Sequence, residues 1–180
     1  MWYDVPRLLW IKSVTRDDDL LAYAGEDPTT RAREPRAPGD AFDLHASQEA
    51  AESLALPAVG DIIALTQHDQ LTHLVEVTGA GVEKRPRRTM RAGTRDARYS
   101  VQRACKLLVL RVFADAPMID EAFGFDPDAK GGDVFEIASL PAVVRSGVPL
   151  WAVQRRIDRA IKGELRAQVH ARRRARSRSW

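Results

Sequence analysis

The chain has 180 residues, 44% of them hydrophobic, which is enough for one compact domain with a buried core and too many for a disordered chain. It contains no apolar run that approaches the roughly 20 residues of a transmembrane helix, and its first residues lack the basic and apolar stretches of a secretory signal. The one cysteine, Cys105, excludes an internal disulfide and has no partner at a metal-binding spacing. These features predict a cytoplasmic protein in a reducing environment.

The net charge of +3 hides a strong separation of charge along the sequence. Residues 84–106 contain nine Lys or Arg and one acidic residue, and residues 155–178 contain ten and two. The rest of the chain has nine basic and 22 acidic residues. An acidic body with two basic segments is typical of a protein that binds a polyanion such as DNA or RNA. A solvated helix face and a disordered tail are the alternative explanations.

The first third of the chain predicts one strand, two helices and a long loop. Residues 7–12 form an apolar run that indicates a buried first strand. Residues 15–25 predict a helix, because acidic residues in its first turn suit the helix dipole. Residues 26–40 are rich in proline and polar residues and predict a loop, and residues 47–54 predict a short exposed helix.

Two apolar runs, residues 61–67 and 72–78, flank a short polar break and predict a pair of adjacent antiparallel strands. Polar side chains gather at one end of this pair, where they could converge on a ligand. They are Thr66, Gln67, Thr72 and His73. The alternative is that the threonines are present for their β-propensity and that His73 is satisfied by a neighbouring carbonyl group.

The second half of the chain alternates between polar and apolar segments. The basic residues 84–106 predict a long loop or a hairpin extension, whereas residues 106–113 are apolar on both faces and predict a central strand. Residues 118–123 predict one turn of helix, and residues 134–137 predict an edge strand. Together the strands suggest a small mixed sheet or a partly closed barrel flanked by helices.

Apolar residues recur every three to four positions near the C-terminus and predict a long amphipathic helix. Its apolar face would consist of Leu150, Val153, Ile157, Ile161, Leu165 and Val169. The first half of this face is expected in the core, and the role of the second half is open. The predicted organisation is a domain at residues 1–146, the amphipathic helix at 147–170 packed on it, and a basic disordered tail at 171–180.

Patterns that would indicate catalysis or metal binding are incomplete. Asp61 and Glu76 on neighbouring strands would suit a metal-dependent nuclease, but Thr78 stands where such a site needs a lysine. Residues 40–45 include two Asp and one His, which more often cap and solvate a loop than hold a metal. The glycines at 131–132 lack the Lys-Ser/Thr of a phosphate-binding loop, and no Ser or Cys nucleophile accompanies a His. The sequence therefore favours a protein that is not an enzyme, without cofactor or metal.

Two segments carry motifs that resemble a known family. Residues 8–13, Leu-Leu-Trp-Ile-Lys-Ser, form an apolar-aromatic run that ends in Lys-Ser before a predicted helix. Residues 59–65 place a Gly-Asp turn before a strand, and the return strand 72–77 contains Val-Glu-Val. These segments resemble the PUA-related superfamily of nucleic-acid-binding β-barrels, in particular its EVE and ASCH-type branches.

The resemblance agrees with an α+β fold that contains a small mixed or antiparallel β-barrel flanked by helices, to which the apolar repeat adds the long C-terminal amphipathic helix. It also implies a pocket on the barrel that accepts a flipped-out or single-stranded base, plain or modified. Trp10 would be the stacking platform, Lys12 and Ser13 the phosphate or base-edge contacts, and Gln67, Thr72 and His73 the polar rim. Core packing is the alternative role for Trp10.

The basic insert would add contacts to the nucleic-acid backbone through Arg85, Arg87, Arg88 and Arg91. The resulting prediction is a non-catalytic module that binds DNA or RNA and no membrane. The alternative is a protein-interaction subunit or small homo-oligomer, in which the C-terminal helix binds a protein partner or a second copy of the chain.

Overall fold

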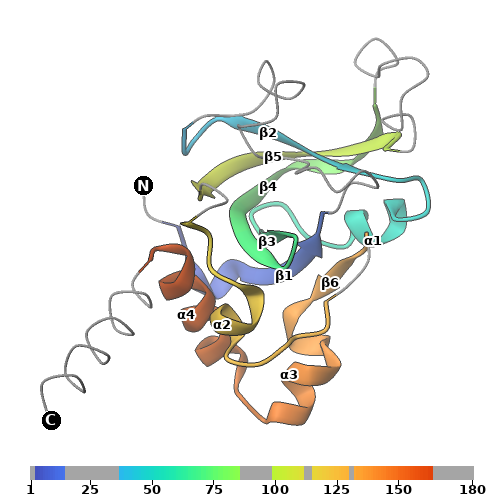
Figure 1. The fold of residues 1–180 in the computed structure, drawn as a ribbon. Coiled ribbons are helices and arrows are strands. Elements are labelled where there is room, and N and C mark those ends of the chain that lie inside the picture. Colours follow the sequence, from blue (N-terminus) through green and yellow to red (C-terminus); the bar gives the residue numbers. More distant parts are fainter. Residues whose placement is uncertain (1–2, 15–36, 86–98, 112–114, 130–131, 164–180) are drawn as a thin grey trace, which may run out of the picture.

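The fold is built on one six-stranded mixed sheet. A computed structural model describes residues 3–14, 37–85, 99–111, 115–129 and 132–163. The strands are β1 (Leu8–Ser13), β2 (Ala41–Ala46), β3 (Ile62–Gln67), β4 (Gln70–Lys84), β5 (Val101–Leu110) and β6 (Val134–Glu136). They lie in the order β2-β5-β4-β3-β1-β6 (Figure 1). The β1–β3 pair is parallel, and the other four pairs are antiparallel.

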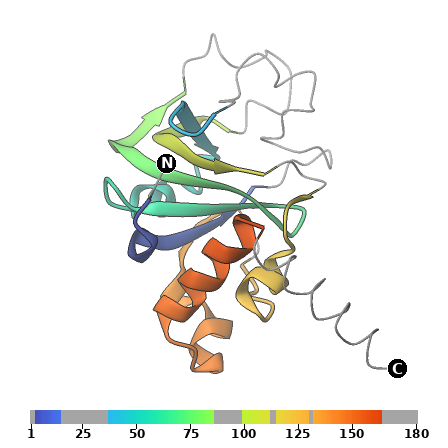
Figure 2. The ribbon, with the colours of Figure 1, turned by 90° about the vertical axis from the view of Figure 1, so that its left-hand side faces the viewer.

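Short helices cover the sheet. They are the 3-10 turns η1 (Val5–Arg7) and η5 (Ile137–Ser139) and the α-helices α1 (Ala51–Ala55), α2 (Ile119–Phe123), α3 (Pro141–Ser146) and α4 (Leu150–Ile161). Figure 2 shows α3 and α4 beneath the sheet, with α2 beside α4. Within the part of the chain that the structure describes, every helix is too short or too polar to cross a membrane.

Alternation along the central strand divides the buried side chains into two clusters. All six residues of β3 are buried, as expected for a strand covered on both faces. Ile62 and Ala64 belong to the cluster that contains residues of α2, α3 and α4, whereas Ile63 and Leu65 belong to the cluster that contains Leu54 of α1. The twofold repeat of a strand therefore gives β3 one face for each layer of helices.

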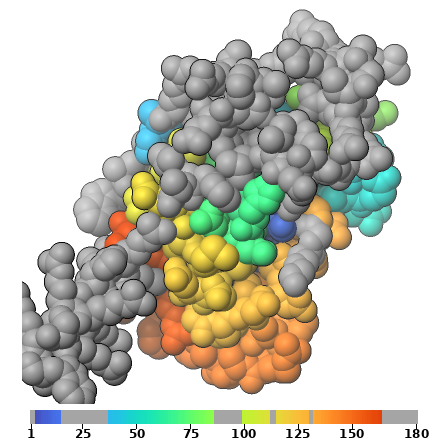
Figure 3. Space-filling model, in the orientation of Figure 1, coloured from blue at the N-terminus to red at the C-terminus, as the bar shows by residue number. Residues whose placement is uncertain are grey.

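A two-residue turn joins β3 to β4 and holds α2 in place. His68 and Asp69 have φ angles of 48° and 60°, and this conformation at both central residues fits a type I′ hairpin turn. The carbonyl oxygen of Asp69 accepts a hydrogen bond from the N–H of Ile119 at 2.7 Å. The surface of this turn (green) meets that of the α2 segment (yellow) in Figure 3. The polar break in the sequence is thus both a turn and an attachment point.

Several predicted elements are confirmed, with small shifts at their ends. The first strand, the strand pair, the turn of helix at α2 and the edge strand β6 all occur where the sequence indicates them. The short helix is α1, which begins later than predicted. The predicted helix at 15–25 and most of the loop at 26–40 lie outside the described residues.

Two predictions in the sheet need correction. Strand β5 begins at Val101, before the predicted start at 106, and β4 extends to Lys84 to pair with it, so of the two predicted alternatives for the basic segment its described ends form the hairpin extension and not the loop. Strand β2 was not predicted, although buried Phe42, Leu44 and Ala46 alternate along it with more exposed residues.

The α+β class is confirmed, but closure into a barrel is not. Strands β2 and β6 occupy the two edges of the sheet and have only one neighbour each among the described strands. Strand β6 has three residues and β2 has six, so both edges are short. The register of β4 against β5 is irregular between Val77 and Val82, and beyond this point the two strands continue as a hairpin.

The C-terminal amphipathic helix packs on the sheet through the predicted apolar face. Val153, Ile157 and Ile161 of α4 are fully buried, which confirms a core role for the first half of the face. Leu165 and Val169 lie outside the described residues. The buried half is therefore unavailable to a partner protein.

Arg103 connects β5 with the end of α1 and with β4. Only 2% of this residue is exposed, and its guanidinium donates to four backbone carbonyl groups. Two belong to the end of α1, Leu54 at 3.2 Å and Ala55 at 3.1 Å, and the others to Pro57 at 2.8 Å and Gly79 at 3.1 Å. Carbonyl groups at a helix C-terminus carry partial negative charge, so a cation is favoured there.

Replacing Arg103 with Met should lower the free energy of unfolding by about 3 kcal/mol or more, because four largely buried carbonyl groups lose their donors. Arg103→Lys should recover only part of this loss, since an ammonium group lacks the planar fork that reaches several oxygens at once. Urea denaturation measures both effects. Arg145→Met on the exposed side of α3 is the control and should leave the unfolding midpoint unchanged. A wild-type midpoint for Arg103→Met would contradict the assigned role.

Candidate nucleic-acid interface

Trp10, the predicted stacking platform, is half-buried in β1. Its indole Nε1 donates to Asp61 Oδ2 at 2.9 Å, and the same oxygen accepts from the N–H of Ala58 at 2.8 Å. The ring also packs against the cluster that contains Ile63. Trp10 therefore ties β1 to the turn before β3, so part of its role is structural. Stacking by the exposed part of the ring stays a prediction.

Lys12 lies inside the protein, which corrects the predicted surface contact. It is 2% exposed, and its Nζ donates to the carbonyl oxygen of Gly132, just before β6. Burial lowers the pKa of Lys12 to about 8, although the nearby Asp133 carboxylate acts in the opposite direction. Asp133 also accepts a hydrogen bond from Ser53 Oγ at 2.9 Å. Ser13, at the end of β1, is only partly exposed.

The predicted polar rim is an internal hydrogen-bond network. Gln67, Thr72 and His73 are exposed by 0%, 1% and 2%. Gln67 Nε2 donates to Thr72 Oγ1 at 3.1 Å, and His73 Nδ1 lies 2.8 Å from the same oxygen. The His73 ring packs at 5.7 Å, centre to centre, from the ring of Phe42. These side chains satisfy one another, so they do not form an open rim.

At least one arginine of the first basic segment, residues 84–106, is buried as well. Arg85 is 7% exposed, and its backbone N–H donates to the carbonyl oxygen of Ser100 at 2.8 Å. A buried Arg85 does not fit the predicted contact with a nucleic-acid backbone. Arg87, Arg88 and Arg91 lie outside the described residues.

Cations at the start of the second basic segment make contacts within the protein. Arg156 donates to the carbonyl oxygen of Phe123 at 2.9 Å, and the Arg155 guanidinium lies 5.8 Å from the centre of the Trp151 ring. Lys162 pairs with Asp158 at 2.7 Å. The Arg156 bond fastens α4 to α2, and the Lys162–Asp158 pair neutralises part of the charge of α4, so the start of this segment is less available to a polyanion than its composition indicates.

The acidic and nucleophilic residues in the described part of the chain do not converge on a catalytic arrangement. Asp61 bonds to Trp10, whereas Glu76 Oε2 pairs with Lys106 Nζ at 2.6 Å. Among the residues that the structure describes, no three His, Cys, Asp or Glu side chains are grouped to hold a metal ion. Cys105 is buried, and burial raises the pKa of its thiol to about 12, so the reactive thiolate is disfavoured.

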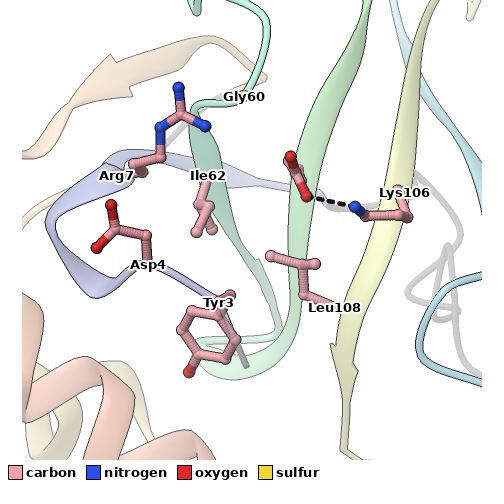
Figure 4. Close-up of a pocket in the computed structure, with 8 residues that line it drawn as sticks. Tyr3, Asp4, Arg7, Gly60, Ile62, Lys106 and Leu108 are labelled. Atoms are coloured by element: carbon pink, nitrogen blue, oxygen red, sulfur yellow. Dashed lines mark ion pairs between the residues drawn. The ribbon is translucent and has the colours of Figure 1, made fainter. Parts of the chain in front are cut away.

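A cleft that the sequence did not reveal opens beside the turn before β3. Its volume is about 170 Å³. It is lined by Tyr3, Asp4, Arg7, Gly60, Ile62, Glu76, Lys106 and Leu108 (Figure 4). The Gly-Asp turn is visible in the sequence, but the strands and the 3-10 turn that complete the cleft come from three distant segments.

Comparison with known proteins gives no relative: no family model matches the chain, and no curated protein matches it.

The burial of Lys12 predicts an unusual dependence of stability on pH. The pKa is about 8 in the folded protein and 10.5 for an ordinary lysine, so between these values the unfolded chain binds more protons. The contribution of Lys12 to stability should therefore rise with pH across this window, by about 3 kcal/mol in total.

Urea denaturation of wild type and Lys12→Met between pH 7 and pH 10.5 tests this dependence. Contributions from other groups, including the opposite one expected from Cys105, are common to both proteins and cancel. The wild type should gain stability relative to Lys12→Met as the pH rises. Parallel stability curves would show that water reaches Nζ and that Lys12 titrates normally.

Trp10→Phe should lower the free energy of unfolding by about 1 kcal/mol, because Asp61 loses the indole donor while the aromatic packing is largely kept. Trp10→Ala should cost more, since it also removes packing. Chemical denaturation of the two variants measures the difference. If both are as stable as wild type, Trp10 has no structural role.

Proposed function

We propose that this protein is a non-catalytic nucleic-acid-binding module of PUA-like architecture. The observation that carries the proposal is the β4–β5 hairpin. Lys84 pairs with Val101, and the next position is closed by the Arg85–Ser100 hydrogen bond. Residues 86–98, with five arginines and one acidic residue, thus start and end next to each other at the end of this hairpin. The five arginines are therefore attached to the described structure at one place, the end of this hairpin.

The negative charge of the rest of the chain supports this assignment. Outside the two basic segments, acidic residues outnumber basic ones by 22 to nine, so a polyanion is repelled from most of the body and directed towards the basic segments, the first of which is attached to the hairpin. Because phosphate contacts position a protein without reading sequence, this element alone would bind DNA and RNA alike.

The finer part of the proposal is that Trp10 contacts a base of the nucleic acid. Gln67, Thr72 and His73 are buried, so in the described structure they could support β4 but not contact a ligand. A base that stacked on the exposed part of Trp10 would contribute about 1–3 kcal/mol, without requiring a polar rim.

A triple Arg87→Gln, Arg88→Gln and Arg91→Gln variant should weaken binding to all nucleic-acid sequences alike. The slope of log K against log salt should become shallower by about 0.9 per lost contact on duplex DNA, or about 0.7 on a single strand. Fluorescence anisotropy with labelled duplex DNA, single-stranded DNA and RNA over a range of salt measures this slope. Arg145→Gln on α3 is the control. No binding by wild type at about 50 mM salt would overturn the proposal, since phosphate contacts are strong there.

A second candidate function is protein interaction, favoured by exposed apolar residues next to the C-terminal helix. Val144 of α3 is 65% exposed and Trp151 of α4 is 61% exposed. Large exposed apolar side chains can mark interaction sites when they are contiguous. In this case the binding surface would be the outer side of α3 and α4 and not the buried face that the sequence indicates.

A further inference from the structure

The cleft beside the Gly60 turn has a composition that points to a ligand of its own. It lies between η1, the start of β3 and the neighbouring strands β4 and β5, on a part of the molecule that the proposed nucleic-acid contacts do not use. Figure 4 shows Asp4 and Arg7 on one side of the cleft and Lys106 on the other, with Ile62 between them.

The charges that line the cleft are balanced but incompletely paired. Glu76 and Lys106 form an ion pair at 2.6 Å and so neutralise each other. Within the described part of the chain, neither the Asp4 carboxylate nor the Arg7 guanidinium has a hydrogen-bond or ion-pair partner. One cation and one anion therefore remain unpaired in the same cleft. A simple anion would pair with Arg7 but would be repelled by Asp4, whereas a ligand with both charges would satisfy both groups.

The backbone of the turn sets the position of Arg7. Gly60 has a φ of 89°, and a Cβ atom there would lie 2.5 Å from Nη1 of Arg7 and 2.8 Å from its Cζ. Glycine thus provides both the turn and the room for the guanidinium to lie against the main chain. A planar guanidinium held in this way suits the two oxygens of a carboxylate.

The remaining walls favour a small apolar group. Ile62 and Leu108 contribute aliphatic surface. The Tyr3 ring is held in place by α4: its hydroxyl donates a hydrogen bond to Asp158, and the Lys162 ammonium lies 5.1 Å from the ring centre. The volume of about 170 Å³ is below the roughly 300–1,000 Å³ of pockets for drug-sized ligands.

We propose that this cleft binds a small zwitterion of the α-amino-acid class with an apolar side chain. The ligand carboxylate pairs with Arg7, its ammonium group pairs with Asp4, and its side chain lies against Ile62, Leu108 and Tyr3. This inference does not depend on the proposed nucleic-acid function, since the two sites use different residues.

Isothermal titration calorimetry of the full chain with L-leucine tests the site, with leucinamide and N-acetyl-leucine as matched ligands that each lack one charge. L-leucine should bind with a dissociation constant of about 1 mM or tighter, and each matched ligand at least tenfold more weakly. Arg7→Gln and Asp4→Asn should each weaken L-leucine about tenfold, and both residues are exposed, so the fold should be kept.

Two further comparisons separate the ligand classes. Arg7→Gln should abolish the preference for L-leucine over leucinamide, which lacks the carboxylate. Asp4→Asn should abolish the preference for L-leucine over N-acetyl-leucine, which lacks the ammonium group. The control Lys84→Gln should change neither preference. Absence of L-leucine binding at about 10 mM would overturn the proposal. So would equal binding of the three ligands, or tighter binding of inorganic phosphate or guanosine than of L-leucine.

Discussion

The guanidinium of Arg103 is the interaction on which the arrangement of this fold most depends. Its four acceptors come from two stretches that are distant in the sequence: the end of α1 with Pro57 just after it, and the irregular part of β4. By holding Pro57 it also fixes the chain just before the Gly60–Asp61 turn, and Asp61 in turn binds Trp10 of β1. One side chain of β5 thereby influences the placement of β1 at the other side of the sheet.

Arg103 also shows that positive charge in the sequence is not the same as positive surface. Lys12, Arg85 and Arg103 are all at least 93% buried, and Lys106 is paired with Glu76. Three of these four belong to the basic segment that first suggests a polyanion partner. The described part of the first basic segment therefore offers less positive charge to a nucleic acid than its composition indicates, and the proposal depends on the five arginines of residues 86–98.

Elements with a regular apolar pattern could be predicted from the sequence, whereas features that depend on contacts between distant segments could not. The β3–β4 pair was predictable because apolar residues dominate both strands. The amphipathic helix was predictable because its apolar residues have a helical repeat. The start of β5 was missed because Arg103 occupies an inward position between buried Val101 and Cys105, where the sequence pattern leads one to expect an apolar residue. The burial of Lys12, Thr72 and His73 could not be predicted, since it depends on contacts with other segments, such as Gly132, Gln67 and Phe42. The cleft, too, is assembled from distant segments.

The order of the strands has a consequence for how the chain folds during synthesis. The β3–β4 hairpin needs only its own two-residue turn to bring its strands together, so it can form as soon as those residues leave the ribosome. The strand β1, made earlier, must wait for β3 on one side and for β6 on the other, and the Lys12–Gly132 contact spans 120 positions. Until β6 is made, one edge of β1 has no backbone partner in the sheet. The last of the described strands thus completes the pairing of the first, and until then the open edge of β1 can pair with another chain.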